Sequence, residues 1–294
     1  MIHVVTVHFM DDRWIGPQLR FLNRFLPPDR TITGCLNGID PRWAPCFDVT
    51  VDLEGEHADK LNALAAIVTS GGADPEDLLL FIDGDAFPIA PVGPDVLGDH
   101  PLAAVRRDEN LADRQPHPSF CLTTVGFWND VGGDWSKGHT WETSTGSQVT
   151  DVGGNLLGIL EERGICWRPL LRSNVVDLDP LYFGVYADLV YHHGAGFRIP
   201  KTRRMLATNR QDVLFAASAA RTPAWVPVVG RVERSLRYRY ADFRQRQQIS
   251  QLVLEARDQA DDVFRAIETN DEFFHMFLDA STEVDTDPSP TAAS

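Results

Sequence analysis

The chain carries, at residues 78–85, the stretch Leu78-Leu79-Leu80-Phe81-Ile82-Asp83-Gly84-Asp85. Five consecutive apolar residues are typical of a strand that is buried on both faces. Such strands lie in the middle of mostly parallel sheets, which bind ligands beyond the carboxyl ends of their strands. We therefore expect this strand to deliver two carboxylates, separated by one glycine, to the functional edge of a sheet.

On both sides of this stretch, the apolar pattern predicts further strands and helices in alternation. Strands are expected over 2–9, 31–36, 47–53, 102–106, 120–125 and 189–193, and helices over 15–26, 61–68 and 154–162. The stretch between Gly126 and Gly154 is rich in Gly, Trp, Ser and Thr and predicts long surface loops. This order indicates an α/β fold with a mostly parallel central sheet flanked by helices.

The composition excludes several classes of protein. The 294 residues include 27 basic and 42 acidic side chains, a formal net charge of -15, which argues against nucleic-acid binding. The four cysteines are widely spaced, the N-terminus does not resemble an export signal, and no stretch approaches the roughly 20 apolar residues of a membrane span. We therefore expect a soluble cytoplasmic protein. The many arginines and only three lysines are typical of a high-GC bacterial genome.

Two carboxylates as close as Asp83 and Asp85 repel each other unless a cation lies beside them. A hard dication with oxygen ligands removes that repulsion and can also bind a diphosphate. Gly84 lets the backbone approach such a ligand closely. The alternative is an ordinary Asp-Gly turn after a strand.

Asp83-Gly84-Asp85 behind an apolar strand resembles the DXD motif of GT-A fold glycosyltransferases, which use nucleotide-sugar donors. The resemblance covers about residues 1–201. It implies that Asp85 binds Mn2+ or Mg2+ and that Asp83 contacts the metal or the ribose. The dication would hold the donor diphosphate and neutralise charge on the departing nucleotide.

A second resemblance lies in His193-Gly194-Ala195-Gly196, which is similar to the His-x-x-Gly element of the glycogenin-like and lipopolysaccharide galactosyltransferase families. There the histidine is a third metal ligand, so we expect His193 to join the two carboxylates. Because successive strand residues face opposite ways, His192 and His193 are not expected to bind one ion together. The lysine that binds the diphosphate in those families is replaced by Ile199, and Arg198 or Lys201 is expected to substitute.

Asp151, in Thr150-Asp151-Val152-Gly153-Gly154-Asn155, opens a predicted helix. An acid there is explained by a helix cap or a dipole partner. In the resembling families an acid before such a helix lies beside the donor sugar and the acceptor. Asp151 would then deprotonate the acceptor hydroxyl in an inverting enzyme, or hold sugar hydroxyls in a retaining one.

Other donor contacts are expected from residues near the strand ends. Thr6 and His8 end the first strand, where GT-A enzymes seat the base and ribose, although His8 also suits a core histidine. Further candidates for the nucleotide or its diphosphate are Lys60, Asn62 and Arg106. The tryptophans of the loop-rich middle suit either sugar stacking or packing under loops.

The expected protein is a metal-dependent glycosyltransferase, a hexosyltransferase with a UDP-sugar favoured as donor. Its acceptor would be a hydroxyl of a polysaccharide or secondary metabolite, and a homo-oligomer is left open. The catalytic domain is expected over 1–205, with a nucleotide-sugar half to about 115 and an acceptor half over 116–205. A helical extension over 206–280 and a disordered acidic tail over 281–294 would follow. The alternatives are a phosphatase of the haloacid dehalogenase type and a non-catalytic sugar-nucleotide-binding protein.

Overall fold

A computed structural model describes residues 1–110, 113–143, 146, 148–175, 183–194 and 260–278. Its centre is a seven-stranded sheet with the order β10-β6-β7-β4-β1-β2-β3. The strands span β1 Ile2–Phe9, β2 Arg30–Asn37, β3 Val49–Val51, β4 Leu78–Asp83, β6 Leu102–Val105, β7 His117–Thr124 and β10 Arg168–Leu170. The strand that ends in Asp83 therefore lies in the middle of the sheet.

The central sheet is mostly parallel, which confirms the predicted α/β class. β1 runs parallel to both β2 and β4, and the outer pairs β2–β3 and β6–β10 are parallel as well. Only β7 is antiparallel to its neighbours β4 and β6. In the β1–β4 register Val7 pairs with Asp83, so the carboxyl ends of these two strands meet at one edge.

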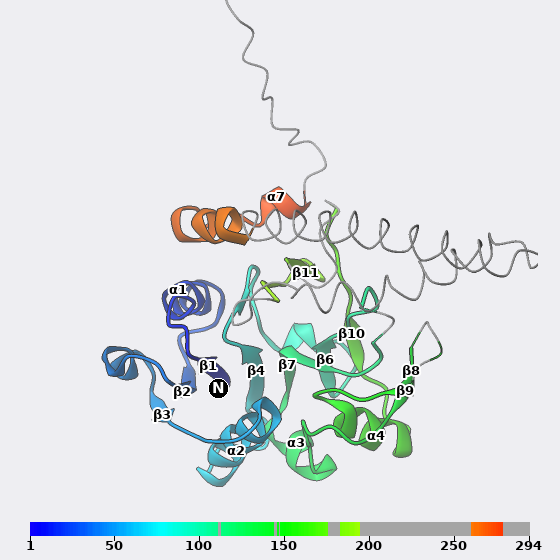
Figure 1. Cartoon of the computed structure of the whole chain (residues 1–294). Coiled ribbons are helices and arrows are strands. Elements are labelled where there is room, and N and C mark those ends of the chain that lie inside the picture. The colour runs from blue at the N-terminus through cyan, green and yellow to red at the C-terminus, as the bar shows by residue number, and fades with distance from the viewer. Residues whose placement is uncertain (111–112, 144–145, 147, 176–182, 195–259, 279–294) are drawn as a thin grey trace, which may run out of the picture. The chain divides into compact units, whose positions relative to one another are not determined.

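Helices cover both faces of the sheet (Figure 1). Helix α1 (Ile15–Phe25) packs on the face that carries Leu80 and Ile82. Helices α2 (His57–Ser70), α3 (Val125–Val131) and α4 (Gly154–Glu162) cover the opposite face, which carries Leu79 and Phe81. Because alternate residues of β4 face opposite layers, its five apolar residues, Leu78 to Ile82, are all buried.

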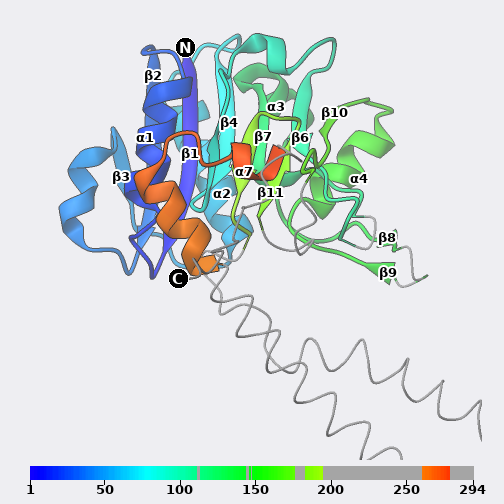
Figure 2. The ribbon, with the colours of Figure 1, turned by 90° about the horizontal axis from the view of Figure 1, so that it is seen from above.

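A small antiparallel sheet, β11-β12-β5, lies beside the carboxyl edge of β4. It consists of β5 (Ala86–Pro88), β11 (Gly184–Tyr186) and β12 (Val190–His192). β5 begins directly after Asp85, so the Asp-Gly-Asp turn connects the two sheets. The short helix α7 (His275–Leu278) lies over β11 (Figure 2).

The region predicted as loops contains regular structure, which is a correction. Thr124 caps α3 by accepting a hydrogen bond from the backbone N–H of Phe127 at 3.1 Å. The rings of Trp128 and Trp135 pack 4.6 and 5.0 Å from that of Phe81, so these two tryptophans belong to the core. The remaining short elements are β8 Trp141–Glu142, β9 Gln148–Val149, η1 Pro41–Cys46 and η2 Pro94–Val96.

The chain divides into two compact units, Met1–Phe197 with Glu272–Ser294 and Arg198–Asp271. Most of the expected helical extension over 206–280 and all of the expected tail over 281–294 lie outside the described residues, although 260–269 are helical. The division into nucleotide-sugar and acceptor halves stays a prediction. Among the described helices, none combines the length and apolar character of a membrane span.

Candidate metal centre

The side chain of Gln18, on α1, forms hydrogen bonds with the backbone at the Asp83–Asp85 turn. The Gln18 amide nitrogen donates to the carbonyl oxygens of Asp83 and Ala86, at 2.7 and 2.9 Å. Both of these partners can only accept, so they determine which way the amide lies. A single fully buried side chain thus connects the end of β4 to the start of β5.

The oxygen of the Gln18 amide forms hydrogen bonds with Thr6 and His8, two residues that were predicted to contact the nucleotide. This oxygen accepts hydrogen bonds from Thr6 Oγ1 at 3.2 Å and from His8 Nε2 at 3.0 Å. Thr6 and His8 are fully buried, and burial lowers the pKa of His8 to about 4. The structure therefore places both side chains beneath the turn, where they orient Gln18.

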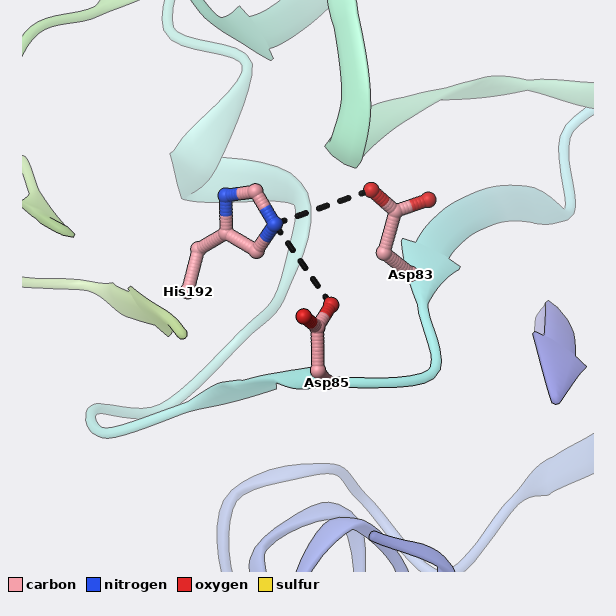
Figure 3. Close-up of side chains that lie close together, drawn as sticks. All are labelled: Asp83, Asp85 and His192. Carbon is pink, nitrogen blue, oxygen red and sulfur yellow. Dashed lines mark ion pairs between the residues drawn. The ribbon is translucent and has the colours of Figure 1, made fainter. Parts of the chain in front are cut away.

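Three side chains converge above this turn (Figure 3). Nε2 of His192 lies 3.8 Å from Asp83 Oδ2 and 3.5 Å from Asp85 Oδ1. One ligand atom from each residue lies within 4.8 Å of the others. The side chains of Asp85 and His192 are only 6% and 8% exposed, so water screens little of the carboxylate repulsion.

This donor set fits a divalent cation. Two carboxylate oxygens and one imidazole nitrogen suit Mg2+, Mn2+ or another first-row dication, since carboxylates are hard ligands and imidazole is a borderline one. Two largely buried carboxylates cost free energy unless positive charge lies beside them. Asp83, Asp85 and His192 are accordingly the residues that would hold the ion.

The third candidate ligand is His192, which corrects the expectation of His193. In the pairing of β5 with β12, Tyr191 lies opposite Phe87 and His192 opposite Ala86. Alternation along β12 then turns His192 toward the carboxylates and Tyr191 and His193 to the other side. The His193 ring contacts Trp14 at 4.5 Å and accepts or donates a hydrogen bond at the Tyr191 hydroxyl at 2.9 Å. Burial lowers the pKa of His193 to about 3.

Sequence reasoning missed two histidines near the centre. His57, the first residue of α2, places Nε2 2.9 Å from Asp83 Oδ1. Burial lowers its pKa, but the charge of Asp83 and the hydrogen bond to it raise the pKa more, so the net shift is upward. The ring of His117 lies 5.8 Å from that of His192. Neither residue belongs to a motif, and only the fold brings them to the carboxylates.

Lys60 was predicted to contact the donor diphosphate. It lies on α2, one turn after His57, and is only 6% exposed. Its ammonium group lies 5.0 Å from the centre of the Phe9 ring, at the carboxyl end of β1. Lys60 is therefore a largely buried cation near the end of a central strand.

Two other nominated residues have protein partners in the structure. Asn62 donates to Asp134 Oδ1 at 2.7 Å and accepts from the backbone N–H of Trp135 at 2.9 Å, so it joins α2 to the loop after α3. Arg106 donates to both carboxylate oxygens of Asp108, at 2.6 and 2.9 Å. The other two nominated cations, Arg198 and Lys201, lie outside the described residues.

Asp151 precedes α4 and is about half exposed. Its carboxylate accepts from the backbone N–H of Val152 at 2.9 Å and lies 3.9 Å from Arg107 Nη2. The N-cap of the helix is Gly153, which adopts φ +88°, so Asp151 is not the cap residue. Arg107 also pairs with the buried Asp113 at 3.0 Å, which joins Asp151 to a small charged cluster.

No protein-family model matches the sequence, and no curated protein matches it. Part of the chain is similar to solved structures. The apo form of the glycosyltransferase GlyE of Streptococcus pneumoniae is 16% identical over 44% of this chain and 35% of its own, with a TM-score of 0.31. A second GlyE structure is 15% identical over 44% of this chain and 36% of its own, with a TM-score of 0.32. S. aureus TarS is 11% identical over 46% of this chain and 30% of its own, with a TM-score of 0.34. The chain spans about a third of the length of these proteins.

Proposed function

We propose that the chain is a metal-dependent glycosyltransferase of the GT-A type, which transfers a sugar from a nucleotide-diphosphate donor to a hydroxyl acceptor. One observation carries the proposal: Asp83, Asp85 and His192 converge at the carboxyl edge of a mostly parallel sheet. Three ligands leave positions on a dication for the two phosphates of a donor.

Mn2+ or Mg2+ held by these three residues would act as a Lewis acid toward the donor diphosphate. The protein's own part is to hold the ligands in place. His57 binds one oxygen of Asp83, and the other oxygen faces His192. Gln18 holds the backbone of the turn. The ligand positions are therefore set before a donor arrives, which lowers the reorganisation cost of binding.

We assign two further roles to residues near the edge. Lys60 would contact the diphosphate, because a buried ammonium group gains most from a doubly charged ligand. Asp151 would serve the acceptor: as a base in an inverting reaction, or by holding sugar hydroxyls in a retaining one. Its side chain is about half exposed and lies 3.9 Å from Arg107 Nη2.

A UDP-hexose is the favoured donor class, and a polysaccharide or secondary-metabolite hydroxyl the favoured acceptor. The proposal includes a bacterial, cytoplasmic enzyme. The donor, the acceptor, the origin and the location are proposed from the sequence resemblance and the composition. Thermal denaturation with different nucleotide-diphosphate sugars tests the donor.

The test is thermal denaturation of the full chain with a panel of nucleotide-diphosphate sugars, with and without Mn2+. A donor at 100 times its Kd stabilises by about 2.7 kcal/mol, which is about 5–10 °C for a domain of this size. We expect the shift to require both metal and donor and to vanish in Asp85→Asn. Asp95→Asn, on an exposed turn, is the matched control and keeps the shift.

Activity measurements separate the alternatives. Mn2+-dependent hydrolysis of the donor without acceptor supports the transferase. A donor shift with neither hydrolysis nor transfer supports a binding protein, and phosphate release from monoesters that requires Asp83 supports a phosphatase. Wild-type protein that responds to neither metal nor donor contradicts the proposal.

A further inference from the structure

The last described segment, Glu272–Leu278, belongs to the same compact unit as the metal centre, although more than 70 residues separate it from β12. It is anchored at its start by an ion pair between Arg24, on α1, and Glu272. Two of its three phenylalanines, Phe273 and Phe277, are each only 2% exposed. The chain therefore returns to this unit to bury aromatic surface.

Phe273 and Phe277 complete what we call the C-terminal aromatic cluster, with Phe21, Phe87 and Tyr191. The Phe273 ring lies 4.9 Å from that of Tyr191 and 5.8 Å from that of Phe87. Phe277 stacks on Tyr191 at 5.6 Å, and Phe21 stacks on Phe87 at 4.6 Å. Since Tyr191 and Phe87 are fully buried, the cluster covers one face of the β5–β12 pair.

The metal centre lies on the opposite face of the same two strands. Tyr191 is paired with Phe87, and the next residue, His192, is paired with Ala86, directly after Asp85. The backbone N–H of His193 donates to the carbonyl of Asp85 at 3.0 Å and extends this register. Any shift of Tyr191 along or across the strand therefore moves the imidazole of His192 relative to the carboxylates.

The ladder between β5 and β12 is short. β5 and β12 each have three residues, which allows few ladder hydrogen bonds. The turn that leads into β12 contains Ala187 and Asp188, both at φ 52°, a left-handed conformation that strains residues other than glycine. A short strand after a strained turn depends on side-chain packing for its position.

We propose that Phe273 and Phe277 are positioning residues for the metal centre, which act through Tyr191 to keep His192 beside Asp83 and Asp85. The inference rests on the proposed metal centre and adds the C-terminal segment to it. Metal–ligand distances tolerate only about 0.2 Å, so a small relaxation of β12 is enough to weaken binding. Loss of a group that orients a ligand typically costs 10–100-fold in metal affinity.

The test is Mn2+ binding to the full chain, followed by the electron paramagnetic resonance signal of the free ion, together with the melting temperature. Phe277→Ala and Phe273→Ala empty the cluster, and Phe277→Leu refills most of it. Leu160→Ala, on the buried face of α4, is the matched control because it also truncates a buried side chain. We expect the Mn2+ Kd to rise about 10–100-fold in both alanine variants. In Phe277→Leu and in the Leu160→Ala control, we expect the Kd to stay within about threefold of wild type.

The outcomes separate the two proposals. If wild-type protein binds Mn2+ and the folded alanine variants bind it equally well, the positioning role is wrong and the metal centre stands. An equal loss in Leu160→Ala also overturns the positioning role, because general destabilisation then explains the effect. If wild-type protein binds no Mn2+, the proposed function and this inference both fail. Should an alanine variant not fold, Tyr191→Leu tests the same contact with a smaller cavity: a roughly 10–100-fold higher Mn2+ Kd supports the positioning role, and a Kd within about threefold of wild type overturns it.

Discussion

Replacing Gln18 by leucine tests whether a single buried amide holds the Asp-Gly-Asp turn in place. Leucine has a similar volume and keeps the helix, but it removes every polar atom of the side chain. Four groups then lose their hydrogen bond to this side chain: the carbonyls of Asp83 and Ala86, the Thr6 hydroxyl and the His8 imidazole N–H.

The magnitude follows from the burial of these groups. Gln18, Thr6 and His8 are all completely buried, so water does not replace the lost hydrogen bonds. A buried polar group without a partner costs about 1–3 kcal/mol, and the lower end of that range for four groups gives about 4 kcal/mol. Such a loss is a large part of the free energy of unfolding of a typical domain, which is ~5–15 kcal/mol.

The assay is urea unfolding of the Gln18→Leu variant, combined with Mn2+ titration of the folded protein. We expect a loss of about 4 kcal/mol in the free energy of unfolding and a roughly 10–100-fold higher Mn2+ Kd, because the turn that carries both carboxylates loosens. Thr6→Val is the control, since it removes one donor of the network and is expected to cost about 1 kcal/mol.

Gln18→Glu sharpens the test. Its second oxygen would face the two carbonyl oxygens that now lie 2.7 and 2.9 Å from the amide nitrogen. We expect it to be at least as destabilising as leucine at neutral pH, because a buried carboxylate gains no donor there. If Gln18→Leu unfolds within about 1 kcal/mol of wild type and binds Mn2+ unchanged, the turn does not depend on Gln18.

Three further predictions follow from single contacts. His192→Ala should raise the Mn2+ Kd at least tenfold with little change in melting temperature. His193→Ala should instead lower the melting temperature, because His193 fills a buried aromatic site. Equal effects of the two variants on Kd and on melting temperature would contradict the assignment of His192, and not His193, as the ligand. Gly153→Ala should cost about 2–4 kcal/mol in urea unfolding, because alanine is strained at φ +88° and its Cβ would collide with a backbone carbonyl oxygen; a loss below 0.5 kcal/mol would refute this. Asn62→Leu should cost about 2 kcal/mol, because it removes one hydrogen bond of Asp134 and the acceptor of the Trp135 backbone N–H; an unchanged Mn2+-dependent donor shift in this variant would show that Asn62 is structural and not a donor contact.

Several features of this protein could be predicted from residue patterns alone. The apolar run before Asp83 identified a central strand, since only a strand covered on both faces needs five apolar residues in succession. The helix that Pro27 and Pro28 bring to an end and the one that starts at Gly154 were also predicted, and both were found. Two carboxylates at the carboxyl edge of a parallel sheet followed from the same local information.

Pairing between distant segments required the tertiary structure. Which of two adjacent histidines faces the carboxylates depends on the register of β12 against β5, and a shift of one residue would exchange them. Thr6 and His8 lie at the end of β1, where the resemblance predicts the nucleotide, but Gln18 on α1 forms hydrogen bonds with both of them. Phe273 and Phe277 are ordinary apolar residues of a helical pattern until the chain folds back onto Tyr191.

Local residue patterns were sufficient to predict the layers, the central strand and the two acidic candidate ligands, because burial and alternation are properties of neighbouring residues. The third candidate ligand, the hydrogen bonds of Gln18 to the turn and the aromatic packing against β12 required the three-dimensional structure. Those contacts join residues far apart in the chain, and no local pattern specifies the register in which they meet.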